Sequence, residues 1–100
     1  MIDNYNNISR LEGFQGYTKL FDKQQKCYGF AVNLKYFEDR LPADLFLRTD
    51  KSNIVNTADV KRHFPQSGKT IAVMYDLNQV PVMPEKTELL EAMMLRNKQD

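Results

Sequence analysis

The stretch that decides the predicted fold is Lys26-Cys27-Tyr28-Gly29-Phe30-Ala31-Val32. Side chains along a β-strand point alternately to its two faces. Tyr28, Phe30 and Val32 therefore share one face, and only small residues occupy the other. The aromatic face is either sheet core, since Phe and Tyr are often buried, or a platform on which nucleic-acid bases stack. We predict a strand here, and these seven residues alone leave both roles open.

Two neighbouring segments show a similar strand pattern. Residues 16–22 read Gly-Tyr-Thr-Lys-Leu-Phe-Asp, and residues 44–48 read Asp-Leu-Phe-Leu-Arg. In the second segment alternation predicts two leucines in the core, with Asp44, Phe46 and Arg48 on the outer face. Asp44 could accept hydrogen bonds from base amino groups, and Arg48 could stack on a base or pair with a phosphate. This pattern favours a binding face.

The order of these three segments resembles the cold-shock domain, a small five-stranded barrel of the OB class. That family reads Gly-x-Val-Lys-Trp-Phe-Asn, then Lys-Gly-Phe-Gly-Phe-Ile, then Asp-Val-Phe-Val-His, and the resemblance is clearest over residues 16–48. Leu20 stands where the family has tryptophan. The resemblance implies single-stranded RNA or DNA as the ligand, bound across the sheet. The binding residues that it implies are Lys19, Phe21, Lys26, Tyr28, Phe30, Asp44, Phe46 and Arg48.

The remaining segments complete a single mainly β domain over residues 1–100. Residues 1–13 are polar and are predicted to form a loose arm, followed by a five-stranded antiparallel OB/cold-shock-like barrel over residues 14–83. Thr57 is a plausible N-cap for a short internal helix over residues 58–63. Residues 69–75 and 80–83 read as the last two strands. An added C-terminal helix is predicted over residues 84–98, because Pro84 suits a first helical position.

The C-terminal helix has an apolar stripe at helical spacing. The stripe could pack on the barrel, which a domain this small needs. It could instead bind a protein partner or a second copy of the chain, because methionine-rich faces adapt to partners. The stripe consists of Leu89, Leu90, Met93 and Met94.

The composition limits the classes of function. The formal net charge is +1, so nucleic-acid binding would need a local basic patch. We see no nucleophile–base pair, no glycine-rich phosphate loop and no metal-ligand cluster, and so expect neither an enzyme nor a cofactor. The one cysteine, Cys27, suits a reducing cytosol. No signal peptide is visible, and the longest apolar run is too short to span a membrane, so we expect a cytoplasmic protein.

Two functions follow from these observations. The first is binding of single-stranded nucleic acid through the aromatic and basic sheet face. The alternative is a small protein-interaction module, a regulator or inhibitor that uses the barrel face or the C-terminal helix. The near-zero net charge and the leucine at position 20 favour the alternative.

Overall fold

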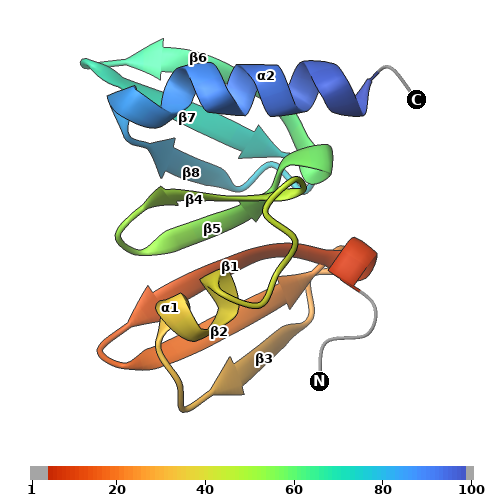
Figure 1. The fold of residues 1–100 in the computed structure, drawn as a ribbon, viewed down its shortest axis with the longest axis vertical. Coiled ribbons are helices and arrows are strands. Elements are labelled where there is room, and N and C mark those ends of the chain that lie inside the picture. The colour runs from red at the N-terminus through yellow and green to blue at the C-terminus, as the bar shows by residue number, and fades with distance from the viewer. Residues whose placement is uncertain (1–4, 99–100) are drawn as a thin grey trace.

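The computed structural model describes residues 5–98, which form two antiparallel sheets and two α-helices. The five-stranded sheet has the order β3-β2-β1-β5-β4, and the three-stranded sheet has the order β6-β7-β8. The two sheets lie one above the other in Figure 1. The strands are β1 (Ile8–Phe14), β2 (Tyr17–Asp22), β3 (Cys27–Phe30), β4 (Phe46–Asp50), β5 (Asn53–Asn56), β6 (Val60–Gln66), β7 (Lys69–Met74) and β8 (Gln79–Val82).

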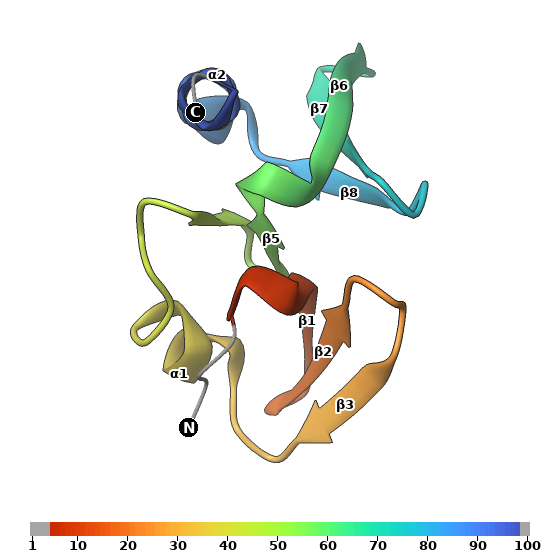
Figure 2. The ribbon, with the colours of Figure 1, turned by 90° about the vertical axis from the view of Figure 1, so that its right-hand side faces the viewer.

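The helices α1 (Leu34–Glu38) and α2 (Thr87–Asn97) lie on the same side of the molecule, as Figure 2 shows. Asn33 caps α1 by accepting a hydrogen bond from the Tyr36 amide, and Pro84 opens the 3-10 turn that leads into α2. No helix within residues 5–98 is both long and apolar enough to cross a membrane. The 3-10 turns are η1 (Tyr5–Asn7), η2 (Thr57–Asp59) and η3 (Pro84–Lys86).

The two-stranded unit β4–β5 lies between two hydrophobic clusters. Phe46 and Ile54 join the cluster that includes Leu34 and Phe37 of α1. Leu47 and Val55 join a second cluster, to which α2 contributes Leu90, Met93 and Met94. Both faces of β4–β5 are therefore buried, and this unit connects the two halves of the molecule.

The mainly β fold with antiparallel sheets and a C-terminal helix is confirmed, but the predicted five-stranded barrel is wrong. The described residues form no closed barrel, because β3 and β4 are the two outer strands of the five-stranded sheet and do not pair. After β5 the chain builds a separate sheet instead of closing the first. Three of the four residues in the predicted helical stripe are buried, so they pack within the molecule; Leu89 remains exposed.

The predicted loose arm is wrong over residues 8–13, which belong to β1. This strand is the centre of the five-stranded sheet and pairs with both β2 and β5. Leu11 is fully buried, and Ser9 donates a buried hydrogen bond to Asp59. The strand resembled an arm because it has few large apolar residues. The first four residues of the predicted arm, residues 1–4, lie outside the described residues.

The predicted internal helix over residues 58–63 is also wrong. Helical structure is limited to the single turn η2, and its cap is Asn56, whose side chain accepts a hydrogen bond from the Ala58 amide. Thr57, the predicted cap, instead donates to the Leu45 carbonyl. From Val60 onward the chain pairs with β7, and this pairing ends the turn after three residues.

Candidate nucleic-acid interface

The predicted aromatic platform is only partly available at the surface. Phe46 is 7% exposed and belongs to the α1 cluster, so its predicted outward orientation is wrong. The alternation of side chains along β4 gave the wrong prediction because both faces of this strand are covered by core. Phe21 is half-buried, and the Arg10 guanidinium lies 4.0 Å from the centre of its ring. Phe46 is therefore closed to a base, and Arg10 occupies one face of the Phe21 ring.

The predicted residues separate into two groups. Lys19, Lys26, Tyr28 and Phe30 lie on or beside the β2–β3 pair, and all four are exposed. The Phe30 ring contacts the Phe37 ring edge to face, with centroids 5.3 Å apart. Asp44, Phe46 and Arg48 lie on or just before β4, at the other margin of the same sheet, and β1 and β5 separate them from the β2–β3 pair. The structure therefore does not assemble one face from all eight residues.

A different surface collects the turns of three hairpins. The turns of β1–β2 (residues 15–16), β4–β5 (residues 51–52) and β6–β7 (residues 67–68) lie at the left of Figure 1, beside the connection from β8 to α2. We call this surface the hairpin-tip edge. The Gly13 amide donates to the Ser52 carbonyl over 2.8 Å, and the Met83 amide donates to the Thr49 carbonyl over 2.8 Å. These bonds tie the neighbouring segments together.

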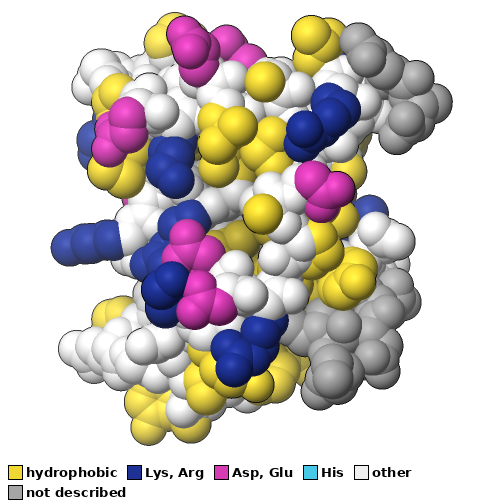
Figure 3. All heavy atoms as spheres, viewed as in Figure 1, with side chains coloured by type: hydrophobic (Ala, Val, Ile, Leu, Met, Phe, Trp, Pro, Cys, Tyr) yellow, Lys and Arg dark blue, Asp and Glu magenta, His cyan; other side chains and the backbone are white. Residues whose placement is uncertain are grey.

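Lys51 occupies the centre of the hairpin-tip edge. It lines a hollow of about 260 Å³ together with the β1–β2 turn and the start of α1. It also lines a second hollow, of about 310 Å³, together with Lys69 and residues 81–84. Figure 3 shows Lys and Arg side chains gathered on this side, next to Asp and Glu side chains. The edge is therefore a continuous, hollowed surface with mixed charge.

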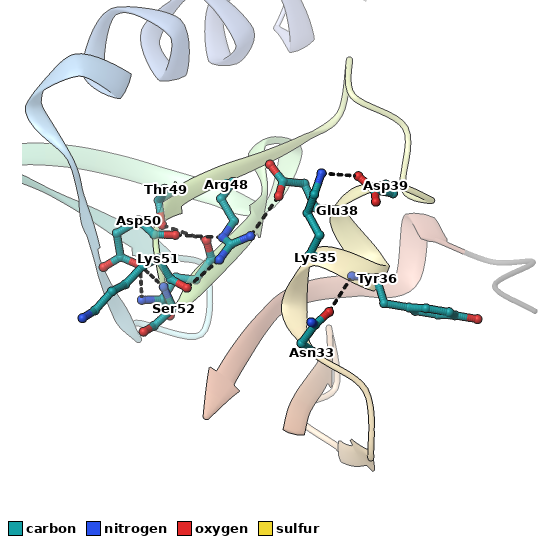
Figure 4. Close-up of polar contacts among 11 residues, drawn as sticks. Asn33, Lys35, Tyr36, Glu38, Asp39, Arg48, Thr49, Asp50, Lys51 and Ser52 are labelled. Atoms are coloured by element: carbon teal, nitrogen blue, oxygen red, sulfur yellow. Dashed lines mark hydrogen bonds and ion pairs between the residues drawn. The ribbon is translucent and has the colours of Figure 1, made fainter. Parts of the chain in front are cut away.

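Arg48 fixes the backbone of the β4–β5 turn, as Figure 4 shows. Its Nε donates to the Asp50 carbonyl over 2.9 Å, and its Nη2 donates to the Lys51 carbonyl over 2.6 Å. Its Nη1 donates to Oε1 of Glu38, on α1, over 2.8 Å. Asp50 braces the turn from inside by accepting from the Ser52 amide over 2.8 Å. The guanidinium is thus occupied in positioning the turn.

Charge pairing leaves the turns more positive than the helix beside them. Lys35 of α1 and Asp39, the C-cap of this helix, pair over 2.7 Å, and this hydrogen bond raises the pKa of Lys35 above its ordinary value. Arg48 is paired with Glu38. Within residues 5–98, Lys51 and Lys69 have no carboxylate oxygen within 4.0 Å. Both lysines are exposed, so they can contact an anion without breaking an existing ion pair.

Comparison with known proteins identifies the family. Residues 2–94 match the family model of the LytTr DNA-binding domain. The chain belongs to this family. A solved structure from Bacillus cereus has the same fold, with a TM-score of 0.77. Its description is the LytTr DNA-binding domain of a methyl-accepting/DNA response regulator. It is 23% identical, over 90% of this chain and 83% of that chain. No curated protein matches the sequence.

The family membership corrects the resemblance to cold-shock domains. The chain is a LytTr DNA-binding domain, so the expectation of nucleic acid as ligand holds in the form of DNA, while the cold-shock and OB assignments are wrong. RNA binding has no support. The three strand segments had the right order, but the sheet continues through β1 and β5 rather than closing into a barrel.

Sequence reasoning missed the hairpin-tip edge of this LytTr domain. Arg48 was predicted as a ligand contact, and the structure shows that its guanidinium holds the β4–β5 turn. Lys51 and Lys69 were not predicted. A signal was present: each lysine lies within or next to a short polar turn between two strand patterns, residues 50–53 and 66–69. Within the described chain no group of three metal-binding side chains is close enough to hold a metal ion.

Proposed function

We propose that this LytTr domain binds double-stranded DNA through the hairpin-tip edge. The observation that carries the proposal is a pair of exposed lysines, Lys51 and Lys69, which have no carboxylate partner among the described residues. Lys51 lies in the turn that Arg48 braces. Contacts between lysine or arginine and phosphate supply most of the sequence-independent affinity for a duplex. Because the turn is braced, its backbone loses little conformational entropy when Lys51 binds a phosphate.

The shape of the edge supports a duplex rather than a single strand as ligand. A single strand binds best to a groove lined with stacking aromatic rings, and two of the predicted rings are covered. The major groove of B-DNA is about 12 Å wide and admits a two-stranded β-ribbon. The molecule extends 32 Å along its longest axis, close to the length of one B-DNA turn of about 34 Å. The hairpin turns are distributed along this axis (Figure 1).

The proposal is tested by fluorescence anisotropy with a mixed-sequence 25-bp duplex and with one of its strands alone. We expect tighter binding to the duplex, and we expect the logarithm of the association constant to fall linearly with the logarithm of the salt concentration. Lys51→Gln and Lys69→Gln should each make the slope shallower by about 0.9, which is one released counterion per phosphate contact. The control is Lys23→Gln, an exposed lysine in the β2–β3 turn, which should leave both affinity and slope unchanged.

Two results would contradict the proposal. The first is tighter binding to the single strand than to the duplex. The second is an unchanged salt slope in a Lys51→Gln/Lys69→Gln double variant that remains folded by circular dichroism. If Lys23→Gln alone changed the slope, the contact surface would lie at the β2–β3 turn instead.

We further propose that the domain acts by binding alone, as the DNA-contacting part of a regulator in the cytoplasm. Two observations support this role: the hairpin-tip edge presents lysines rather than a nucleophile paired with a base, and the single cysteine, Cys27, is exposed, which suits a reducing compartment. Incubation with a labelled duplex should leave the DNA uncut and unmodified, as gel electrophoresis would report.

A further inference from the structure

We infer that Phe14, at the turn of the β1–β2 hairpin, contacts the 5-methyl group of thymine in the major groove, so that the DNA preference of this domain depends on that methyl group. The inference rests on the proposed duplex binding and adds a specificity-determining residue to it. Phosphate contacts do not explain why this apolar side chain is exposed.

Phe14 is unusually exposed for a phenylalanine. Its side chain is 68% exposed, more than any other large hydrophobic residue among those described. Its partner across the hairpin, Tyr17, is 61% exposed, and neither ring is paired with another aromatic ring in the described structure. Single exposed apolar residues are common on surfaces. Two exposed rings on paired residues next to one hairpin turn form a patch, and such a patch indicates a contact surface.

The turn between the two rings has a defined conformation. Gln15 and Gly16 both have positive φ angles, 49° and 84°, which is typical of a tight two-residue hairpin turn of the type I′ class. The hairpin is anchored to the β4–β5 turn by the bond from the Gly13 amide to the Ser52 carbonyl. The backbone that carries the two rings is therefore fixed in a tight, anchored hairpin rather than in a loose loop.

The position of Phe14 relative to Lys51 indicates what the ring would meet. Phe14, Tyr17 and Lys51 line the same hollow of about 260 Å³. A duplex whose phosphate contacts Lys51 brings its groove edge close to the β1–β2 turn. The Phe14 ring has no hydrogen-bond donor for a phosphate. The apolar group that a base pair presents in the major groove is the thymine methyl, which phenylalanine contacts in other DNA complexes.

The test removes the methyl group and the ring separately. A 20-bp duplex is first selected from a random pool by the wild-type protein, then synthesised with thymine and with deoxyuridine at every thymine position. Uracil pairs as thymine does but lacks the methyl. We expect wild-type affinity to fall about fourfold for each contacted methyl, the effect of one buried methyl-sized group. Phe14→Ala should bind the thymine duplex as weakly as wild type binds the uracil duplex, with no further loss on uracil.

A matched control and a second ring variant make the result specific. Tyr75 is 60% exposed and lies beyond the end of β7, away from the hairpin-tip edge, so Tyr75→Ala should keep the full thymine-to-uracil ratio. Phe14→Leu, which keeps an apolar side chain, should retain part of that ratio. Circular dichroism confirms that each variant is folded.

Each other outcome overturns the inference. In one such outcome, wild type binds the thymine and uracil duplexes with equal affinity, and Phe14→Ala weakens binding to both equally. The ring then acts as a wedge between bases rather than as a methyl contact. If neither change matters, Phe14 lies outside the interface; the Lys51→Gln salt slope then shows whether duplex binding itself stands. If no duplex is selected and the lysine variants have no effect, the proposed function fails as well.

Discussion

The β4–β5 and β2–β3 hairpins have the same architecture but present different surfaces to solvent. Each is an antiparallel pair joined by a short polar turn that contains lysine. Both faces of β4–β5 are covered by core, so its turn is the most exposed part of this hairpin. In β2–β3 the outer strand β3 is exposed along all four residues. A covered hairpin presents a turn, which suits the groove of a duplex, whereas an outer hairpin presents a face, which suits flat ligands.

The largest expected effect is on stability, and it compares one apolar residue from each hairpin. Ile54→Ala in β5 removes a side chain that is 1% exposed, so we expect a loss of about 2–5 kcal/mol in the free energy of unfolding. Phe30→Ala in β3 removes a larger side chain that is 41% exposed, and should cost less than Ile54→Ala. Urea denaturation followed by circular dichroism measures both. Equal costs would show that β3 is as embedded as β5.

The second prediction concerns the arginine that braces the β4–β5 turn. Arg48→Met keeps most of the apolar stem but removes two bonds to backbone carbonyls and one to Glu38, so we expect a loss of about 1–3 kcal/mol in unfolding free energy. Arg48→Lys should cost nearly as much, because an ammonium cannot reach all three acceptors in this geometry. Denaturation in urea is again the measurement.

The brace and a phosphate contact are separated by two further measurements. Glu38→Gln removes the ion pair but leaves the two carbonyl bonds, and should therefore cost less than Arg48→Met. Arg48→Met should weaken duplex binding with little change in the salt slope, because its charge is already paired with Glu38. A slope change as large as that of Lys51→Gln would instead assign Arg48 a direct phosphate contact.

Much of the β structure was predictable from alternation and turn residues. The strand patterns at residues 16–22, 26–32, 69–75 and 80–83 correspond to β2, β3, β7 and β8. The C-terminal helix predicted over residues 84–98 is present as the 3-10 turn η3 followed by α2, which begins at Thr87. These elements have one face toward a core or follow a strong local signal. Burial alternates along β2 and β8, where a local pattern applies directly. β7 is buried at all but its first residue and β3 is exposed throughout, so these two strands are marked by their residue types and bounding turns rather than by alternating burial.

The missed features all depend on contacts between distant parts of the chain. β1 has only a few large apolar residues, and part of its packing comes from Arg10, whose guanidinium lies over the Phe21 ring of β2. Phe46 looked exposed because it alternates with two leucines, and only the packing of α1 shows that its face is buried. The role of Arg48 depends on three acceptors, one of them from α1. Alternation carries no information on which element covers a face.

The smallest expected effect compares a glycine in a hairpin turn with a glycine in an exposed strand. Gly16 has a φ of +84° and open space around its missing side chain, so Gly16→Ala adds backbone strain without a clash and should cost about 1–2 kcal/mol. Gly29, in β3, also faces open space but has no positive φ. Gly29→Ala should therefore be close to neutral or slightly stabilising, by up to about 1 kcal/mol, since alanine loses less backbone entropy on folding.

Duplex binding by the same two variants tests the difference between a turn and a face. Gly16→Ala distorts the turn that positions Phe14 and Tyr17, so it should weaken duplex binding under conditions in which the protein remains folded. Gly29→Ala adds a methyl group to the exposed β3 strand and should bind the duplex as wild type does. The reverse order, with weaker binding for Gly29→Ala, would move the interface to β2–β3, because a ligand lying across that strand approaches its backbone most closely at Gly29.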